Sequence, residues 1–429
     1  MPLRRPFVSL PLASLFLVSF SLISPAFAQT TPQVQAAAAK PEVKAAMARL
    51  DQNRPQLLEV WKKLALTSAP SGHEDERAAL VMSELKRLGY TDTYRDAAGN
   101  VISAPIAKDA RITAFVAHLD TVVQPGVKVT VTEGKNAKGH PSWTGPGVGD
   151  DASGVVALLG VVEAMRHAGL SLPNVRWVFS VNEEGGGTSE GIGRFIADHK
   201  PAIAAFISTD GSPIDELGAV TDNGVGTYPL FPTFSGPGVH TIESSGTPST
   251  TRAVALAIER IYRLEIPQTP LEKRSWLNIG TIKAGTVPNA MAKDAEFTVD
   301  LRSNDAATGR ALRDKVKAVI EGAARDAGVS VKIDTTRWQR DPISLKTPEQ
   351  QRLIETLWAS YRAIGVTPQK GKIGSSDFVI ALAQGIPAAG IGLTNIRRMH
   401  SPEEEAEIDP LFTGMKEVLV AAVALSQRQ

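Results

Sequence analysis

Two kinds of hydrophobic pattern alternate along the chain. Short continuous apolar runs are separated by longer segments in which apolar residues recur every three or four positions. The first kind predicts buried strands and the second predicts helices. Up to residue 223 we expect strands at 112–118, 175–181 and 204–208, and helices at 41–66, 74–88, 152–167 and 190–199. This alternation predicts the α/β class, with a mostly parallel sheet and flanking helices.

The hydrophobic pattern changes over residues 224–337, where strand-like and helical segments follow each other in a different order. The expected elements are strands at 225–235, 276–284, 293–302 and 329–336, and helices at 248–263 and 305–327. The α/β pattern then resumes with helices at 347–363 and 376–384, a strand at 388–393 and a last helix from about 408. We therefore predict one α/β domain in two parts, 41–223 and 338–429, around an inserted α+β domain at 224–337.

The N-terminus is typical of an export signal. Residues 1–28 combine Arg4 and Arg5 with an apolar stretch and an Ala26-Phe27-Ala28 cleavage pattern. The pattern predicts a periplasmic or secreted bacterial protein without a stable membrane span after cleavage. It leaves the Sec and twin-arginine routes both open. Residues 29–40 are low in complexity, and we expect them to form a flexible lead-in.

Composition then narrows the chemistry. Among 429 residues, 46 Lys and Arg balance 45 Asp and Glu, and this gives no reason to expect a nucleic-acid partner. Cysteine is absent, which excludes disulfides, thiolate metal sites and cysteine nucleophiles. Any metal must be held by carboxylates and by some of the seven histidines.

Histidines and carboxylates gather where predicted strands end. They are His118, Asp120, Glu183, Glu184, Asp210 and His400, together with Asp150 before the helix at 152–167. In open α/β sheets, sites form beyond the carboxyl ends of the strands. This set suits two divalent ions about 3.5–4 Å apart. Zinc is the first choice, although manganese and cobalt accept the same ligands.

The same segments resemble a known family, the co-catalytic two-zinc metallopeptidases and amidohydrolases related to peptidase T, carboxypeptidase G, acetylornithine deacetylase and aminoacylase. The resemblance covers nearly the whole mature chain. It rests on Ala117-His-Leu-Asp-Thr-Val122, Gly149-Asp-Asp-Ala-Ser-Gly154, Asn182-Glu-Glu-Gly185, Ser208-Thr-Asp-Gly211 and Met399-His-Ser-Pro-Glu403.

The resemblance implies a role for each of these residues. His118 binds one ion, His400 binds the other, and Asp150 bridges them, with the first Asp of the Asp150-Asp151 pair taken as the bridge. Glu184 and Asp210 complete the two ligand sets. Glu183 is implied as the general base, and Asp120 as the carboxylate that supports His118.

For residues 224–337 the resemblance implies a lid that also forms a homodimer. His240 would reach into the partner's site and stabilise the oxyanion. Asn289 and Arg302 would hold the substrate backbone or carboxylate, and the turn with Ser375 and Asp377 would line the substrate pocket. The zinc-exopeptidase-like catalytic domain would then comprise 41–223 and 338–429.

These observations predict a secreted metal-dependent hydrolase of short peptides. An N-acyl amino acid deacylase using the same site stays open. An alternative of another class is a metal-free protein of this fold that binds peptides without cleaving them.

Overall fold

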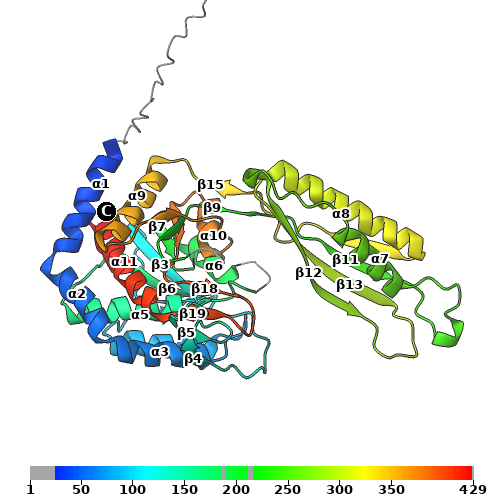
Figure 1. The fold of residues 1–429 in the computed structure, drawn as a ribbon, viewed down its shortest axis with the longest axis horizontal. Coiled ribbons are helices and arrows are strands. Elements are labelled where there is room, and N and C mark those ends of the chain that lie inside the picture. The colour runs from blue at the N-terminus through cyan, green and yellow to red at the C-terminus, as the bar shows by residue number, and fades with distance from the viewer. Residues whose placement is uncertain (1–24, 186–188, 211–215, 428–429) are drawn as a thin grey trace, which may run out of the picture.

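The computed structural model describes residues 25–185, 189–210 and 216–427, which form two bodies of different size (Figure 1). The larger body contains a sheet of eight strands in the order β1-β2-β6-β3-β7-β17-β8-β16. The strands are β1 (Tyr94–Arg95), β2 (Val101–Ile102), β3 (Ile112–His118), β6 (Val175–Ser180), β7 (Ile203–Ser208), β8 (Ala219–Thr221), β16 (Gln369–Lys370) and β17 (Ala388–Ile391). The central strand β3 pairs in parallel with both β6 and β7, and all seven of its residues are buried. The predicted mostly parallel sheet is therefore confirmed.

Helices cover both faces of this sheet. The helices of the larger body are α1 (Pro25–Ala39), α2 (Pro41–Gln52), α3 (Arg54–Leu66), α4 (Asp75–Arg87), α5 (Ala152–His167), α6 (Glu190–His199), α9 (Pro348–Ala363), α10 (Asp377–Ala383) and α11 (Ile408–Ser426). Helices α5, α9 and α11 share one core with α1 to α4, whereas α6 and α10 pack into a second core on the opposite side. Helix α5 has thirteen buried residues, so its sequence is apolar on nearly every side rather than along one stripe.

A smaller four-stranded sheet lies beside the end of β3. Its order is β18-β19-β5-β4, from β4 (Thr132–Lys135), β5 (Pro141–Thr144), β18 (Ile396–Arg397) and β19 (Glu405–Glu407). Pairing of β19 with β5 brings the segment after His400 against the loop before Asp150. Residues about 250 positions apart therefore meet at one edge of the body, a contact that no local pattern could reveal.

The second body is the inserted unit. Strands β10 (Gly226–Thr227), β11 (Phe231–Ser235), β12 (Ser275–Ala284), β13 (Asp294–Ser303) and β14 (Ser330–Asp334) form its antiparallel sheet, and α7 (Thr250–Tyr262) and α8 (Ala306–Ala327) pack on one face. The chain enters through β9 (Asn223–Gly224) and returns through β15 (Ile343–Ser344), which pair with each other. Arg340 still pairs with Thr227 of the second body, so the return crossing lies beyond the predicted boundary at 338.

Short 3-10 turns complete the described elements. They are η1 (Lys200–Ala202), η2 (Thr241–Glu243) and η3 (Leu271–Lys273). None of the described helices combines the length and apolar composition that a membrane span needs.

Two expectations about the N-terminal region are wrong. Residues 29–40 are not a flexible lead-in, because all but Lys40 belong to α1, where Val34 and Ala37 are buried against α9 and α11. The alanine run that reads as low complexity has high helix propensity. The single helix expected at 41–66 is two helices that meet at Asn53, since Pro55 starts a new helix and cannot donate into a continuing one. Most of the predicted signal, residues 1–24, lies outside the described residues.

Candidate metal centre and substrate cleft

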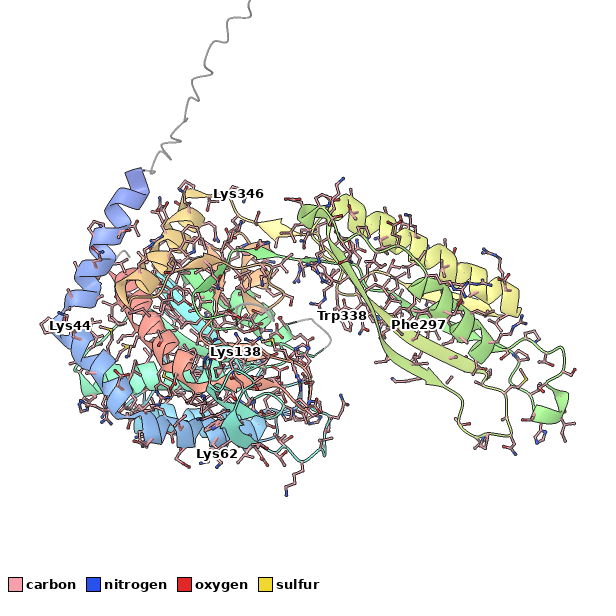
Figure 2. The ribbon with its side chains drawn as sticks, viewed as in Figure 1. Lys44, Lys62, Lys138, Phe297, Trp338 and Lys346 are labelled. Carbon is pink, nitrogen blue, oxygen red and sulfur yellow. The ribbon has the colours of Figure 1, made fainter. Side chains whose placement is uncertain are left out.

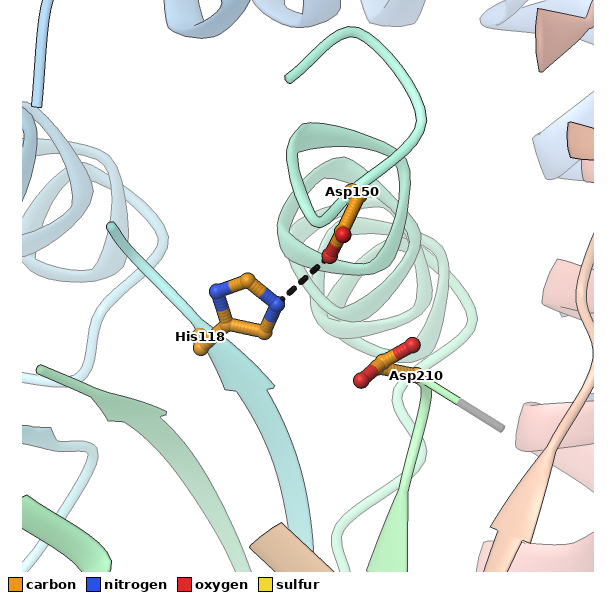
Figure 3. A group of neighbouring side chains, drawn as sticks. All are labelled: His118, Asp150 and Asp210. Atoms are coloured by element: carbon orange, nitrogen blue, oxygen red, sulfur yellow. Dashed lines mark hydrogen bonds and ion pairs between the residues drawn. The ribbon is translucent and has the colours of Figure 1, made fainter. Parts of the chain in front are cut away.

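The site is built where three neighbouring parallel strands end. His118 is the last residue of β3, Asp210 follows β7, and Glu183 and Glu184 follow β6. Asp150 directly precedes the N-terminus of α5. Figure 3 shows His118, Asp150 and Asp210 converging from their separate elements.

Asp150 lies between the two imidazoles. Its Oδ1 is 2.8 Å from Nε2 of His118, and its Oδ2 is 3.1 Å from Nε2 of His400. The other contact of His400 Nε2 is Glu184 Oε1 at 3.0 Å. One carboxylate thus offers a different oxygen to each histidine, which is the geometry that a bridging ligand needs.

Two sets of possible ligands share Asp150. The first is His118, Asp150 and Asp210, and the second is Asp150, Glu184 and His400. Within each set the ligand atoms lie within 4.8 Å of one another. A third set contains His118, Glu183 and Glu184. Imidazole nitrogens and carboxylate oxygens are the ligands of zinc and related divalent ions, so the donor set fits two such ions.

The pKa shifts of these side chains also favour the binding of cations at the site. Burial, followed by the negative charge of Asp150, raises the pKa of Glu184 and raises that of Asp210 to about 7. Hydrogen bonding to Asp150 and Glu184 raises the pKa of His400 to about 11. Burial alone would raise the pKa of Asp150, but its contacts with His118 and His400 outweigh burial and lower it. Several buried carboxylates in one place need positive charge, which protons or bound cations can supply.

Asp151 has a different structural role from Asp150. Its Oδ1 accepts from the backbone N–H of Gly154 at 2.9 Å, so it caps α5. Its Oδ2 accepts from the backbone N–H of His118 at 3.1 Å. Asp151 therefore joins the start of the helix to the end of β3, and it belongs to none of the three candidate ligand sets.

Asp120 supports more than the imidazole. Its Oδ1 is 3.5 Å from Nδ1 of His118, whose hydrogen-bond partner is instead the backbone carbonyl of Asp120 at 3.1 Å. The Asp120 carboxylate accepts from the backbone N–H groups of Glu183 and Glu184 at 3.0 and 2.9 Å, and from the Ser71 hydroxyl at 2.7 Å. It thereby holds the turn after β6 next to the end of β3.

A cleft of about 450 Å³ extends from these residues into the second body. Arg302 and Ser375 line it, beside Asp150, Glu184 and His400. In this chain Arg302 also pairs with Asp300, with an Nη2–Oδ2 distance of 3.0 Å.

Three predicted substrate residues do not line this cleft. Asp377 is buried, and its Oδ2 accepts from Ser180 at 2.5 Å; burial raises its pKa to about 6. The expectation that Asp377 faces the substrate is corrected, because as first residue of α10 it points toward the sheet. His240 and Asn289 lie together elsewhere, on two adjoining exposed loops, where the N–H of Thr241 donates to the carbonyl of Asn289 at 3.0 Å.

Four residues at the site are not among the predicted site residues. Ser376 lines the cleft and donates to the backbone carbonyl of Asp210 at 2.8 Å. Arg340 lines the cleft from the segment between β14 and β15. Glu404 is buried and accepts from the backbone N–H groups of Gly149 and Asp150 at 2.7 and 2.9 Å. Glu404 lies only four residues after His400 in the sequence, but its hydrogen-bond partners are about 250 residues away and leave no local pattern.

The fourth missed residue, Arg77, is also buried and donates to the backbone carbonyls of Leu119 and Thr67 at 2.8 Å each. Burial lowers its pKa to about 10, with Asp120 and Asp151 opposing that shift. It places a fixed positive charge close to the carboxylates. An arginine within an amphipathic helix gives no local sign of such a role.

Comparison with known proteins identifies the family of this chain. Residues 114–424 match the family described as Peptidase family M20/M25/M40, and the chain belongs to this family. An uncharacterised protein of Bacillus subtilis named YqjE is 22% identical over 384 residues, which are 86% of this chain and 98% of that protein.

Two solved structures have the same fold. A tripeptidase from Staphylococcus aureus superposes with a TM-score of 0.65 at 20% identity, covering 88% of this chain and 99% of its own. Human carnosine dipeptidase 1 superposes with a TM-score of 0.69 at 14% identity, and the match covers 90% of this chain and 99% of the dipeptidase chain. Membership of the family makes this protein a metallo-hydrolase that acts on amide bonds.

Proposed function

We propose that this protein is an exported hydrolase that cleaves short peptides with two divalent metal ions. The observation that carries the proposal is the pair of ligand sets that share Asp150. His118 and Asp210 would complete the first ion's ligands, and His400 and Glu184 the second's. The donor set suits zinc first, with cobalt or manganese as alternatives.

The two ions would polarise the scissile carbonyl and acidify the attacking water. Glu183 would take the water's proton as general base and then deliver it to the leaving amine. Its carboxyl is buried beside Glu184, and burial raises its pKa well above the usual value; the charge of His118 opposes this shift, and the charges of Glu184 and Asp377 add to it. Asp120 would hold the Glu183 backbone, so that the base stays next to the ligands.

Short peptides are the proposed substrates. The second body forms one wall of the cleft, and Arg302 and Arg340 line it. A guanidinium can bind a free carboxylate through two parallel hydrogen bonds, which favours substrates that end near the scissile bond. The names of the tripeptidase and the dipeptidase that share the fold support this choice. An N-acyl amino acid carries the same carboxylate, so a deacylase is the second candidate.

Export and dimerisation are part of the proposal. Cleavage after Ala28 would remove the start of α1 but keep Val34 and Ala37, which the core needs. A homodimer through the second body would bring His240 of one chain to the other chain's site. The exposure of Ile242, at 87%, supports an interface near that histidine.

The test is a metal and substrate assay on purified protein. After treatment with a chelator, the protein is incubated with zinc, cobalt or manganese, its bound metal is counted, and it is given dipeptides, tripeptides and N-acetyl amino acids. We expect two ions per chain and metal-dependent cleavage, with peptides ahead of N-acetyl amino acids. Preference for the latter would favour the deacylase. Protein that binds peptides with neither metal nor hydrolysis would instead be a binding protein of this fold.

A further inference from the structure

The part of the cleft that the second body forms has an aromatic wall. Phe231 and Trp338 line it, with Pro229 and Val299 beside them. The two rings meet edge to face, with their centroids 5.0 Å apart and an angle of 85° between their planes. Trp338 is 41% exposed. Figure 2 labels it at the edge of the second body that lies next to the larger body. Exposed aromatic surface in a cleft is characteristic of binding sites for apolar groups.

The backbone holds Trp338 in an unusual conformation. Its φ is 56°, in the left-handed region that a bulky residue rarely adopts. Its carbonyl accepts from the Thr227 hydroxyl at 2.6 Å, and Thr227 exchanges two backbone hydrogen bonds with Arg340 at 2.8 and 2.9 Å. Residues held in such conformations are concentrated at ligand-binding sites.

The same short segment supplies a positive charge. Arg340 is two residues from Trp338, and its side chain is largely enclosed. Burial lowers the pKa of Arg340; the charge of Arg302 adds to this shift and Glu183 opposes it, so all three groups are within electrostatic reach. A ligand near Glu183 can therefore place a carboxylate at the arginines and a neighbouring side chain against the indole.

We propose that the aromatic wall formed by Phe231 and Trp338 selects substrates whose carboxyl-terminal residue, on the leaving-amine side of the scissile amide, is aromatic or large and apolar. The inference rests on the proposed hydrolase function and holds for both peptides and N-acyl amino acids. Thr227 binds the backbone of both Trp338 and Arg340, so the aromatic wall lies next to the arginine. A substrate whose carboxylate binds Arg340 therefore presents its carboxyl-terminal side chain, on the leaving-amine side, to the wall.

The experiment compares alanyl-phenylalanine, phenylalanyl-alanine and alanyl-alanine as substrates of the metal-loaded protein. We expect kcat/KM to be highest for alanyl-phenylalanine. In Trp338→Ala the preference for alanyl-phenylalanine over alanyl-alanine should fall roughly ten- to a hundredfold, since one large apolar contact is lost. Trp338→Phe should retain most of it. Tyr262→Ala removes an exposed aromatic ring of the same body outside the cleft and should leave the preference unchanged.

Trp338→Gly separates the ring from the strained backbone, because glycine adopts positive φ without steric strain. It should lose the preference as Trp338→Ala does. A native preference for phenylalanyl-alanine, or a preference that survives in both Trp338→Ala and Trp338→Gly, would overturn the inference while hydrolysis itself remains. If the native metal-loaded protein cleaves no dipeptide, no tripeptide and no N-acetyl amino acid, the proposed function itself has failed. A deacylase is tested with N-acetyl-phenylalanine and N-acetyl-alanine in the same way.

Discussion

Adjacent residues at the metal centre have different structural roles, and Asp150 and Asp151 are the clearest example. Asp150 faces both imidazoles, whereas Asp151 caps α5 and binds the backbone of β3. Asp150→Ala should therefore lose most bound metal and activity together. Asp151→Ala should keep most of the metal but lower the free energy of unfolding by about 1 kcal/mol, as losses of helix caps do.

Metal counting and thermal melts of both variants check this prediction. Loss of metal in Asp151→Ala with retention in Asp150→Ala would mean that the second aspartate is the bridge.

Glu183 and Glu184 form the second such pair. Glu184 contacts His400, while Glu183 adjoins His118 and faces the cleft. Glu183→Gln should keep both ions and lower kcat by roughly 10²–10⁴-fold, because an amide cannot carry the proton. Glu184→Gln is the matched control and should weaken metal binding. A Glu183→Gln protein with full metal and full activity would assign the base to another residue.

At the scale of elements, α1 is part of the folded core rather than a tether. Its contacts with α9 and α11 bury Val34 and Ala37. A chain that begins at Pro41 should therefore melt at a lower temperature than one that begins at Gln29. The two truncations should keep the same metal content per folded chain, since α1 is remote from the centre. Equal melting temperatures would contradict the prediction.

Helix α11 contains a carboxyl group that the fold does not satisfy. Glu417 is fully buried, and neither of its oxygens has a hydrogen-bond partner. Burial holds its pKa well above the usual 4.5, so the folded protein keeps it protonated at pH values where the unfolded chain releases the proton. The folded state is then destabilised progressively as pH rises above about 4.5.

Glu417→Gln removes this titration. The variant should be more stable than the native protein at pH 8, and the difference should shrink as pH falls toward 4.5. Urea denaturation across this range measures it. Glu59→Gln, at an exposed position of α3, is the control and should show no such trend. A constant difference between the Glu417→Gln and native proteins at all pH values would refute the argument.

At the scale of the whole molecule, the second body carries His240 away from its own metal centre. His240 and Asn289 lie on exposed loops and do not line the cleft of their own chain. If the proposed homodimer forms, each site receives His240 from the partner, because a two-fold interface is reciprocal. His240→Ala should then retain its metal and lose roughly 10²–10³-fold in kcat, as removal of an oxyanion donor does.

Mixing gives the sharper measurement. Inactive His240→Ala and inactive Glu183→Gln proteins, after subunit exchange, should regain activity, because one site in each mixed dimer has both groups. Mixed dimers without recovery would mean that His240 acts in its own chain or has no catalytic part. A monomeric active protein would also exclude the exchange of His240.

Much of the larger body was predictable because its signals are local. Strand 112–118 and helices 152–167 and 190–199 agree with β3, α5 and α6 at both ends. Continuous apolar runs and turn residues need no distant partner to be recognised. Since parallel strands end at one edge of a sheet, the order of His118, Glu183 and Asp210 along the chain also predicted that they would meet.

What the chain's own pattern determined is thus the class of fold, the two-part domain and the identity of the side chains that gather at the strand ends. Tertiary structure decided which partners each carboxylate meets. Burial and distant partners turned Asp377 toward Ser180 and brought Glu404 to the loop of Asp150. They also placed Trp338 and Arg340 in the cleft, and they packed α1 into the core. Each of these depends on contacts between residues far apart in the chain, whose energies appear only when the chain has folded.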